Sequence, residues 1–183
     1  MKRFVYLIPL LVLMVVGGFA IKQLSDVSSG KSVRDLPSVL INRNVEAFDL
    51  AAIEGHELGW GTKDLLGQVT IVNVFGSWCV ACLSEHPFLM HIKEKNLVPI
   101  FGIDWREKNP QDGPRWLAKY GDPYTRIGGD PESKAAIAFG VTGAPESFLV
   151  DKQGVIRYKQ TGPINAQVWE QTLWPLILEL RKQ

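Results

Sequence analysis

The pattern of hydrophobic and polar positions divides the chain into three segments. Residues 4–21 (FVYLIPLLVLMVVGGFAI) form an apolar run without a charged residue, directly after Lys2 and Arg3. Residues 22–44 are polar and contain Ser, Gly and Pro, a composition that is typical of a linker. Beyond the linker, apolar and polar stretches alternate, which predicts a globular domain over residues 45–183.

Within this domain, the pattern predicts strands that alternate with helices. Residues 68–75 (QVTIVNVF) and 97–104 (LVPIFGID) are apolar, as in strands that are buried on both faces. The other predicted elements are a short strand at 45–51, a turn or hairpin at 55–61, helices at 83–96, 112–121, 130–140 and 165–182, and a hairpin at 146–160. Helical crossovers between strands imply parallel pairing, so we expect an α/β fold with a mixed sheet and helices on both faces.

Two of these helices carry expectations about single side chains. In the helix at 83–96, the local sequence predicts that His86 lies at the surface. In the helix at 130–140, Asp130 is expected to cap the N-terminus, with Pro131 at the first helical position.

The N-terminal apolar run predicts a membrane segment. As a helix it spans about 27 Å, which is close to the thickness of the hydrocarbon layer of a bilayer. A cleaved signal peptide is the alternative, although the apolar core of a signal peptide is usually shorter. Lys2 and Arg3 favour a cytoplasmic N-terminus. We therefore expect an anchor at residues 1–21 in a bacterial inner membrane and a domain in the periplasm.

Composition narrows the class of partner. Hydrophobic residues make up 46% and charged residues 21% of the chain, as in ordinary globular proteins, and the net charge is +1. The sequence contains no stripe of Lys and Arg that would bind a phosphate backbone. We therefore expect no nucleic-acid partner.

The two cysteines, Cys79 and Cys82, lie in a Cys-x-x-Cys pattern just after the predicted strand at 68–75. A disulfide between them closes a very small loop, which contributes little as a structural crosslink. At a helix N-terminus, the unpaired amides and the helix dipole stabilise a thiolate and lower the pKa of the thiol. The pattern thus predicts a redox pair in which Cys79 attacks a partner disulfide and Cys82 resolves the mixed disulfide.

Other uses of the same residues remain as alternatives. Cys79 and Cys82 with His86 and His91 suggest a zinc site, but four ligands on one side of a single helix cannot converge around a metal. A copper site of Cys with a distant His would need a histidine later in the chain, and the sequence has none. A peroxidase would need a Thr-x-x-Cys arrangement, which this sequence also lacks. We therefore expect no metal ligands and no cofactor.

Four further positions near these motifs are candidates for the site. Trp78 precedes the first cysteine and is expected to shape the docking surface. Pro145 lies at the entrance of a predicted strand, where a proline marks a sheet edge or a special turn. Glu85 and Glu146 are either solvated side chains or acids near the thiols, where their charge disfavours a thiolate.

Three stretches of the chain resemble the DsbE/CcmG family of membrane-anchored, periplasmic thioredoxin-like proteins. They are LPSVLINRNVEAFDL at 36–50, WCVACLSEHP at 78–87 and GVTGAPESFLVDKQGVIRY at 140–158. The resemblance implies a thioredoxin-like fold, with Pro145 as a cis-proline that faces the disulfide and, with Ala144, docks the substrate backbone. It also implies supporting roles for Trp78, Glu85 and Glu146.

The resemblance also implies a function and partners. The activity would be a thiol:disulfide oxidoreductase that reduces the haem-attachment cysteines of apocytochrome c, directly or through another maturation component. A transmembrane reductant of the DsbD/CcdA type would reduce the Cys79–Cys82 disulfide again. The dipeptide Val80-Ala81 departs from relatives that often carry a proline there. A general TlpA-like reductase, or a non-enzymatic chaperone or metal-binding module, is the alternative.

Overall fold

The protein is described by a computed structural model that covers residues 8–28 and 38–183. The chain divides into two compact units, residues 1–36 and 37–183. The domain boundaries expected from the sequence remain a prediction.

The described part of the first unit is helix α1 (Ile8–Ser28), which runs into the range expected to be a linker. Apolar side chains such as Leu13, Phe19 and Ile21 are exposed along it. Across residues 8–28 and 38–183, no helix is long and apolar enough to cross a membrane. The predicted anchor begins in residues 1–7, outside the described part of the chain, and the structure does not show it.

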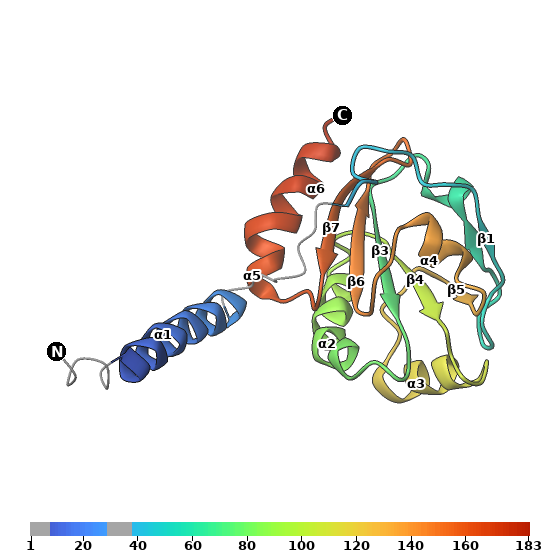
Figure 1. The fold of residues 1–183 in the computed structure, drawn as a ribbon. Helices are drawn as coiled ribbons and strands as arrows, with labels where there is room; N and C mark the ends of the chain where they lie inside the picture. Colours follow the sequence, from blue (N-terminus) through green and yellow to red (C-terminus); the bar gives the residue numbers. More distant parts are fainter. Residues whose placement is uncertain (1–7, 29–37) are drawn as a thin grey trace. The chain divides into compact units, whose positions relative to one another are not determined.

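The second unit is built on a five-stranded mixed sheet (Figure 1) in the order β5-β4-β3-β6-β7. The strands are β3 (Thr70–Phe75), β4 (Ile100–Trp105), β5 (Arg126–Asp130), β6 (Glu146–Val150) and β7 (Ile156–Thr161). Strands β3, β4 and β5 pair in parallel, whereas β6 pairs antiparallel with both β3 and β7. The expected α/β fold with a mixed sheet is confirmed.

Helices and a small hairpin cover the sheet. The remaining elements are β1 (Asp49–Leu50), β2 (Trp60–Gly61), the 3₁₀ helix η2 (Thr62–Leu65), α2 (Val80–Glu94), α3 (Asp112–Tyr120), α4 (Lys134–Ala138), α5 (Ala166–Val168), the π-helical turn η3 (Trp169–Leu173) and α6 (Trp174–Leu180). Strands β1 and β2 pair with each other; β1 lies in the range expected to be a short strand, and β2 lies in the range expected to be a turn or hairpin.

Alternation along the strands separates two apolar clusters, one on each face of the sheet. Ile71 and Phe75 of β3 pack in a cluster with residues of α2, α3 and α6. Val72 and Val74, the alternate residues of β3, pack with residues of α4 and of the β1–β2 hairpin. All six residues of β3 are buried, because both faces of this central strand are covered.

The N-terminus of α4 differs from the expectation. Residues Arg126–Asp130 form β5 and pair with β4, so Asp130 ends a strand and does not begin a helix. Ser133 precedes the helix in a left-handed conformation, with φ of 60°. The Asp130 carboxylate still accepts a hydrogen bond from the Ala136 N–H, at 2.8 Å. Pairing with a neighbouring strand thus overrides the local cap signal.

Residues 38–45 join the β6–β7 hairpin. Asn44 forms an isolated antiparallel bridge with Val155. The Asn42 N–H donates to the Ile156 carbonyl at 2.7 Å, and the Val45 N–H donates to the Gly154 carbonyl at 3.0 Å. The chain therefore enters this unit beside the turn between β6 and β7.

Candidate active site

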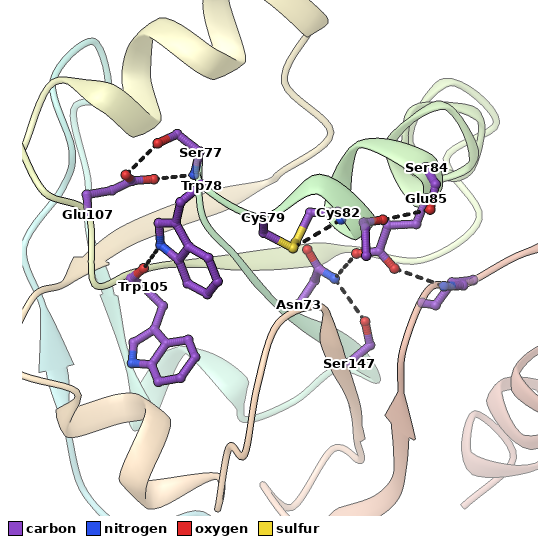
Figure 2. The surroundings of a disulfide bond; sticks show 12 residues. Asn73, Ser77, Trp78, Cys79, Cys82, Ser84, Glu85, Trp105, Glu107 and Ser147 are labelled. Carbon is purple, nitrogen blue, oxygen red and sulfur yellow. Dashed lines mark hydrogen bonds between the residues drawn. A yellow bond between two sulfur atoms is a disulfide. The ribbon is translucent and has the colours of Figure 1, made fainter. Parts of the chain in front are cut away.

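The two cysteines form a disulfide where β3 gives way to α2 (Figure 2). β3 ends at Phe75, and α2 begins at Val80 with Cys79 as its N-cap residue. The Cα atoms of Cys79 and Cys82 are 5.3 Å apart, and the Cys82 N–H points at the Cys79 sulfur at 3.1 Å. Cys79 Sγ thus lies at the positive end of the helix dipole, the position expected for a reactive cysteine.

Exposure distinguishes the two cysteines as predicted. Cys79 is 5% exposed and Cys82 only 1% exposed. Trp78 is 45% exposed, and its indole N–H donates to the Trp105 carbonyl at 3.0 Å. A partner therefore meets Trp78 and the edge of Cys79 first, whereas Cys82 stays behind them.

A buried polar network lies on the same face of the sheet as the disulfide (Figure 2). The Asn73 amide donates one hydrogen bond to Glu85 Oε1 and another to Ser147 Oγ, both at 2.9 Å. The second oxygen of Glu85 accepts the Ile164 N–H at 2.8 Å. Glu85 is therefore a buried acid on α2, one helical turn after Cys82, and not a solvated side chain.

Burial changes the acidity of Glu85. Its side chain is 1% exposed, and desolvation raises the pKa of the carboxyl to about 7. The hydrogen bonds from Ile164 and Asn73 favour the carboxylate and oppose this shift in part. With a pKa near neutrality, Glu85 can both hold and release a proton under physiological conditions.

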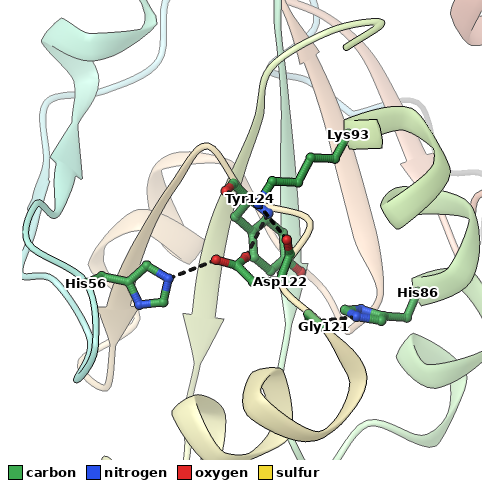
Figure 3. A network of polar contacts seen from close by, with 6 residues as sticks. All are labelled: His56, His86, Lys93, Gly121, Asp122 and Tyr124. Carbon is green, nitrogen blue, oxygen red and sulfur yellow. Dashed lines mark hydrogen bonds and ion pairs between the residues drawn. The ribbon is translucent and has the colours of Figure 1, made fainter. Parts of the chain in front are cut away.

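Tyr124 completes the network from a loop that is held on two sides (Figure 3). Its hydroxyl donates to Asn73 Oδ1 at 2.7 Å. Within the loop, the Tyr124 N–H donates to Asp122 Oδ1 at 2.8 Å. Lys93 of α2 donates to the Asp122 carbonyl at 2.6 Å, and His56 Nε2 lies 3.0 Å from Asp122 Oδ2. The phenol is thus fixed in position beside Asn73.

His86 is buried, so the expectation of a surface position is wrong. The side chain packs edge-on against Trp116, with ring centroids 4.5 Å apart. Its Nε2 donates to the Gly121 carbonyl at 3.0 Å, and burial lowers the pKa of the imidazole (Figure 3). Helix α2 therefore buries the face that includes Cys82, Glu85 and His86.

The loop before β6 contains the predicted proline. The Ala144–Pro145 peptide bond is cis. β6 is paired on both sides, so the proline marks a special turn and not a sheet edge. Ala144 packs against the apolar cluster that contains both cysteines, and the Pro145 carbonyl accepts the Gly162 N–H at 3.0 Å.

Glu146 is buried but has partners other than the disulfide. Its carboxylate accepts hydrogen bonds from the Thr142 N–H at 3.1 Å and the Thr142 hydroxyl at 2.5 Å. Lys159 Nζ lies 3.0 Å from Glu146 Oε2 and also donates to the Gly140 carbonyl at 2.9 Å. Glu146 therefore fastens the loop that carries Pro145, and any direct action on the thiols stays a prediction.

The structure brings Trp78, Cys79, Cys82 and Glu85 together on one segment. Three other members of the site were not among the residues predicted from the sequence: Asn73, Ser147 and Tyr124. Asn73 was detectable, because it is a polar residue in an otherwise apolar strand that is buried on both faces. Ser147 and Tyr124 enter the site only through strand register and loop packing, which local sequence does not encode.

Known proteins share this sequence and fold. Residues 47–172 match the Redoxin family. The thiol:disulfide interchange protein DsbE of Allochromatium vinosum is 41% identical over 144 residues, which are 79% of each chain. DsbE of Pseudomonas aeruginosa is 36% identical over 180 residues, 98% of this chain and 96% of that protein.

One solved structure illustrates the shared fold. A secreted thiol-disulfide isomerase from Corynebacterium glutamicum superposes with a TM-score of 0.62 at 22% identity, over 73% of this chain and 84% of that chain. The resemblance to the DsbE/CcmG family is confirmed by the sequence relatives. The chain therefore belongs to the Redoxin family and, within it, to the DsbE thiol:disulfide interchange proteins, which makes it a thiol:disulfide oxidoreductase.

Proposed function

We propose that this oxidoreductase works in the periplasm as a reductant in cytochrome c maturation, and that its clients are the haem-attachment cysteines of apocytochrome c. The observation that carries the proposal is the pairing of Cys79 at a helix N-terminus with a buried Cys82 beside Glu85. Such a pair can give two electrons to a client disulfide. Its membership among DsbE proteins supports the choice of client.

The reaction proceeds through two exchanges of sulfur. In the reduced protein, the Cys79 thiolate attacks one sulfur of the client disulfide and forms a mixed disulfide. The other client sulfur leaves as a thiolate and takes up a proton. Cys82 then attacks the Cys79 sulfur, the second client sulfur leaves, and the Cys79–Cys82 disulfide forms. Two electrons have passed to the client.

Glu85 accepts the proton that Cys82 loses in the second exchange. Cys82 attacks as a thiolate, so its proton must move to a base, and a buried thiol has little access to water. Glu85 lies one turn further along α2 and has a pKa raised to about 7 by burial. Its carboxylate accepts the proton and releases it after the client departs.

The surroundings of Cys79 dock the client. Trp78 supplies an exposed aromatic surface, and Ala144 and Pro145 lie in the loop that packs on the disulfide cluster. The backbone at Ala144 and Pro145 pairs with an extended segment of the client. Glu146 supports this docking by holding the loop through Thr142.

The remaining components lie outside the domain. A membrane thiol reductant of the DsbD/CcdA type reduces the Cys79–Cys82 disulfide after each turnover. The uncharged run at residues 4–21 after Lys2 and Arg3 supports an N-terminal anchor in the inner membrane. Such an anchor keeps the domain close to both its reductant and its clients.

Trapping of the mixed disulfide tests the proposal. In Cys82→Ser, the second exchange is blocked, so Cys79 should accumulate a mixed disulfide with its client in cells. Cys79→Ser is the matched control and should trap nothing. Identification of apocytochrome c or a maturation component by mass spectrometry supports the proposal. Recovery of unrelated partners alone contradicts it and favours a general TlpA-like reductase.

A further inference from the structure

Trp105 at the end of β4 and Glu107 just after it hold the turn at residues 76–79 in place (Figure 2). Glu107 accepts hydrogen bonds from both the N–H and the hydroxyl of Ser77, the latter at 2.6 Å. Trp105 accepts the indole N–H of Trp78 through its carbonyl, at 3.0 Å. Arg106 lies between these two residues with φ of 53°, a conformation that is uncommon for residues other than glycine.

The turn at residues 76–79 determines where Cys79 lies. The Cys79 N–H donates to the Gly76 carbonyl at 3.0 Å and closes the turn. A Cβ atom at Gly76 would lie 2.4 Å from Trp78 Nε1, so the indole packs directly on the turn backbone. Because Cys79 is the N-cap of α2, a shift of Ser77 or Trp78 displaces the sulfur relative to the helix N-terminus.

Asp104 lies near the end of β4, three residues before Glu107 in the chain. It is 3% exposed, pairs in register with Phe75 of β3, and has one side-chain oxygen, Oδ1, without a hydrogen-bond partner. A Cβ atom at Gly113 would lie 2.0 Å from Asp104 Oδ2, so α3 begins tightly against this carboxyl. Besides burial, Glu107 raises the pKa of Asp104 through its charge and through a side-chain hydrogen bond between the two carboxyl groups. Two carboxyl groups can share a hydrogen bond only when one of them carries a proton.

The groups around Asp104 favour its protonated form. Burial is the largest cause and, with the negative charges of Glu107 and Asp112, raises the pKa of Asp104 to about 8. The titratable groups that face it are Glu107 after β4 and Asp112 at the start of α3, which are both acidic, and Tyr124 before β5, which stays neutral because burial raises its pKa well above the ordinary value. Asp104 therefore carries the shared proton below that pH and loses it above.

We propose that Glu107 is a positioning residue for Cys79, and that protonated Asp104 orients Glu107 by donating a hydrogen bond to it. Without this proton, two adjacent carboxylates repel each other, and Glu107 loses its orientation toward Ser77. The position of Ser77 then depends on the proton of Asp104. This inference deepens the thiol–disulfide exchange proposed above and rests on it.

The inference is tested by the pH dependence of the rate constant for thiol–disulfide exchange, divided by the fraction of Cys79 that is present as thiolate. The reduced full chain reacts with oxidised glutathione between pH 6 and 9.5, and absorbance at 240 nm gives the thiolate fraction. In the wild-type protein, the rate constant per thiolate should fall about tenfold through pH 8, the loss expected for one hydrogen bond to a charged group. A thiolate in a fixed environment would show a constant value.

Three variants distinguish an effect on the position of Cys79 from an effect on folding. Asp104→Asn donates an N–H to Glu107 at every pH, so its rate constant per thiolate should stay high and flat. Glu107→Ala should be low at every pH, because Ser77 loses its acceptor. Glu94→Gln removes an exposed carboxylate from α2 and should follow the wild-type profile.

Glu85→Gln distinguishes the two acids. It should keep the fall through pH 8, because Asp104 and Glu107 are intact. A fall through pH 8 that persists in Asp104→Asn, or a rate in Glu107→Ala equal to that of the wild type, overturns the inference. Absence of exchange in the wild-type protein instead overturns the proposed function. If Glu107→Ala fails to fold, the isosteric Asp104→Asn profile decides alone.

Discussion

The two faces of the central sheet are built by the same strands but differ in character. On the face toward α4, strands β3, β4 and β6 contribute the apolar side chains of Val72, Val74, Phe101, Ile103, Phe148 and Val150, and the polar residues Thr70 and Glu146 lie at strand ends. On the face toward α2, the neighbouring positions include Asn73, Asp104 and Ser147, which are buried to the same degree. One face thus provides ordinary core packing, whereas the other carries the polar groups around the disulfide.

This difference shows how the fold accommodates chemistry within its core. A buried polar group without a partner costs about 1–3 kcal/mol, so a polar face is tolerated only when its groups bond one another. Asn73 satisfies this condition, since both its amide hydrogens and its oxygen have partners. Asp104 departs from it, because its Oδ1 is unpaired. The apolar face provides stability that offsets such costs.

The largest expected effect comes from the apolar face. Phe148→Ala removes a 1% exposed ring that contacts Phe139 at 5.0 Å between centroids. The free energy of unfolding, measured by urea denaturation, should fall by about 3–5 kcal/mol. Exchange by the folded fraction should be retained, because the ring lies across the sheet from the disulfide. Val80→Ala, at an 86% exposed position, is the control, and an equal loss there would contradict the comparison.

An intermediate and pH-dependent effect is expected on the polar face. The pKa of Glu85 is about 7 in the folded protein against an ordinary 4.5, so the folded state binds more protons between these values. Its contribution is therefore present below pH 4.5 and is lost as the pH rises through 7, a change of about 3 kcal/mol. Glu85→Gln removes this dependence.

The measurement for Glu85 is the difference between variant and wild type at two pH values. The free energy of unfolding of Glu85→Gln, relative to the wild type, should rise by about 3 kcal/mol from pH 4.5 to pH 8. Glu94→Gln, at an exposed position of the same helix, should show no such rise. A relative stability that is equal at both pH values would mean that Glu85 is not buried as an acid.

The smallest effect comes from a single hydroxyl. Tyr124→Phe removes the donor at 2.7 Å from Asn73 Oδ1 and leaves that oxygen buried without its partner. The free energy of unfolding should fall by about 1–2 kcal/mol, and exchange should slow because Asn73 is less firmly held. Tyr120→Phe, at a more exposed ring, is the matched control. An unchanged free energy of unfolding in Tyr124→Phe would show that the hydrogen bond from Tyr124 to Asn73 does not stabilise the polar face.

Sequence patterns predicted the elements of the sheet better than the contents of its polar face. The buried strands, the hairpin at β6 and β7, and the helix that starts after Cys79 follow from local apolar runs and turn residues. The contacts of Glu85 do not, because Asn73 and Ile164 reach it from distant parts of the chain. His86 was misplaced for a related reason: its burial depends on Trp116 of another helix.

Residues 38–45 determine where a force applied through the N-terminal segment would reach the domain. They are bonded to the turn after β6, whereas the cis-proline precedes β6 and Cys79 follows β3 at the other end of the same strand pair. The point of attachment is thus about one strand length, roughly 17 Å, from the disulfide end of the sheet. If residues 1–21 anchor the chain in a membrane, as proposed above, a force applied through the N-terminal segment would act on the β6–β7 turn and not on the disulfide end of the sheet.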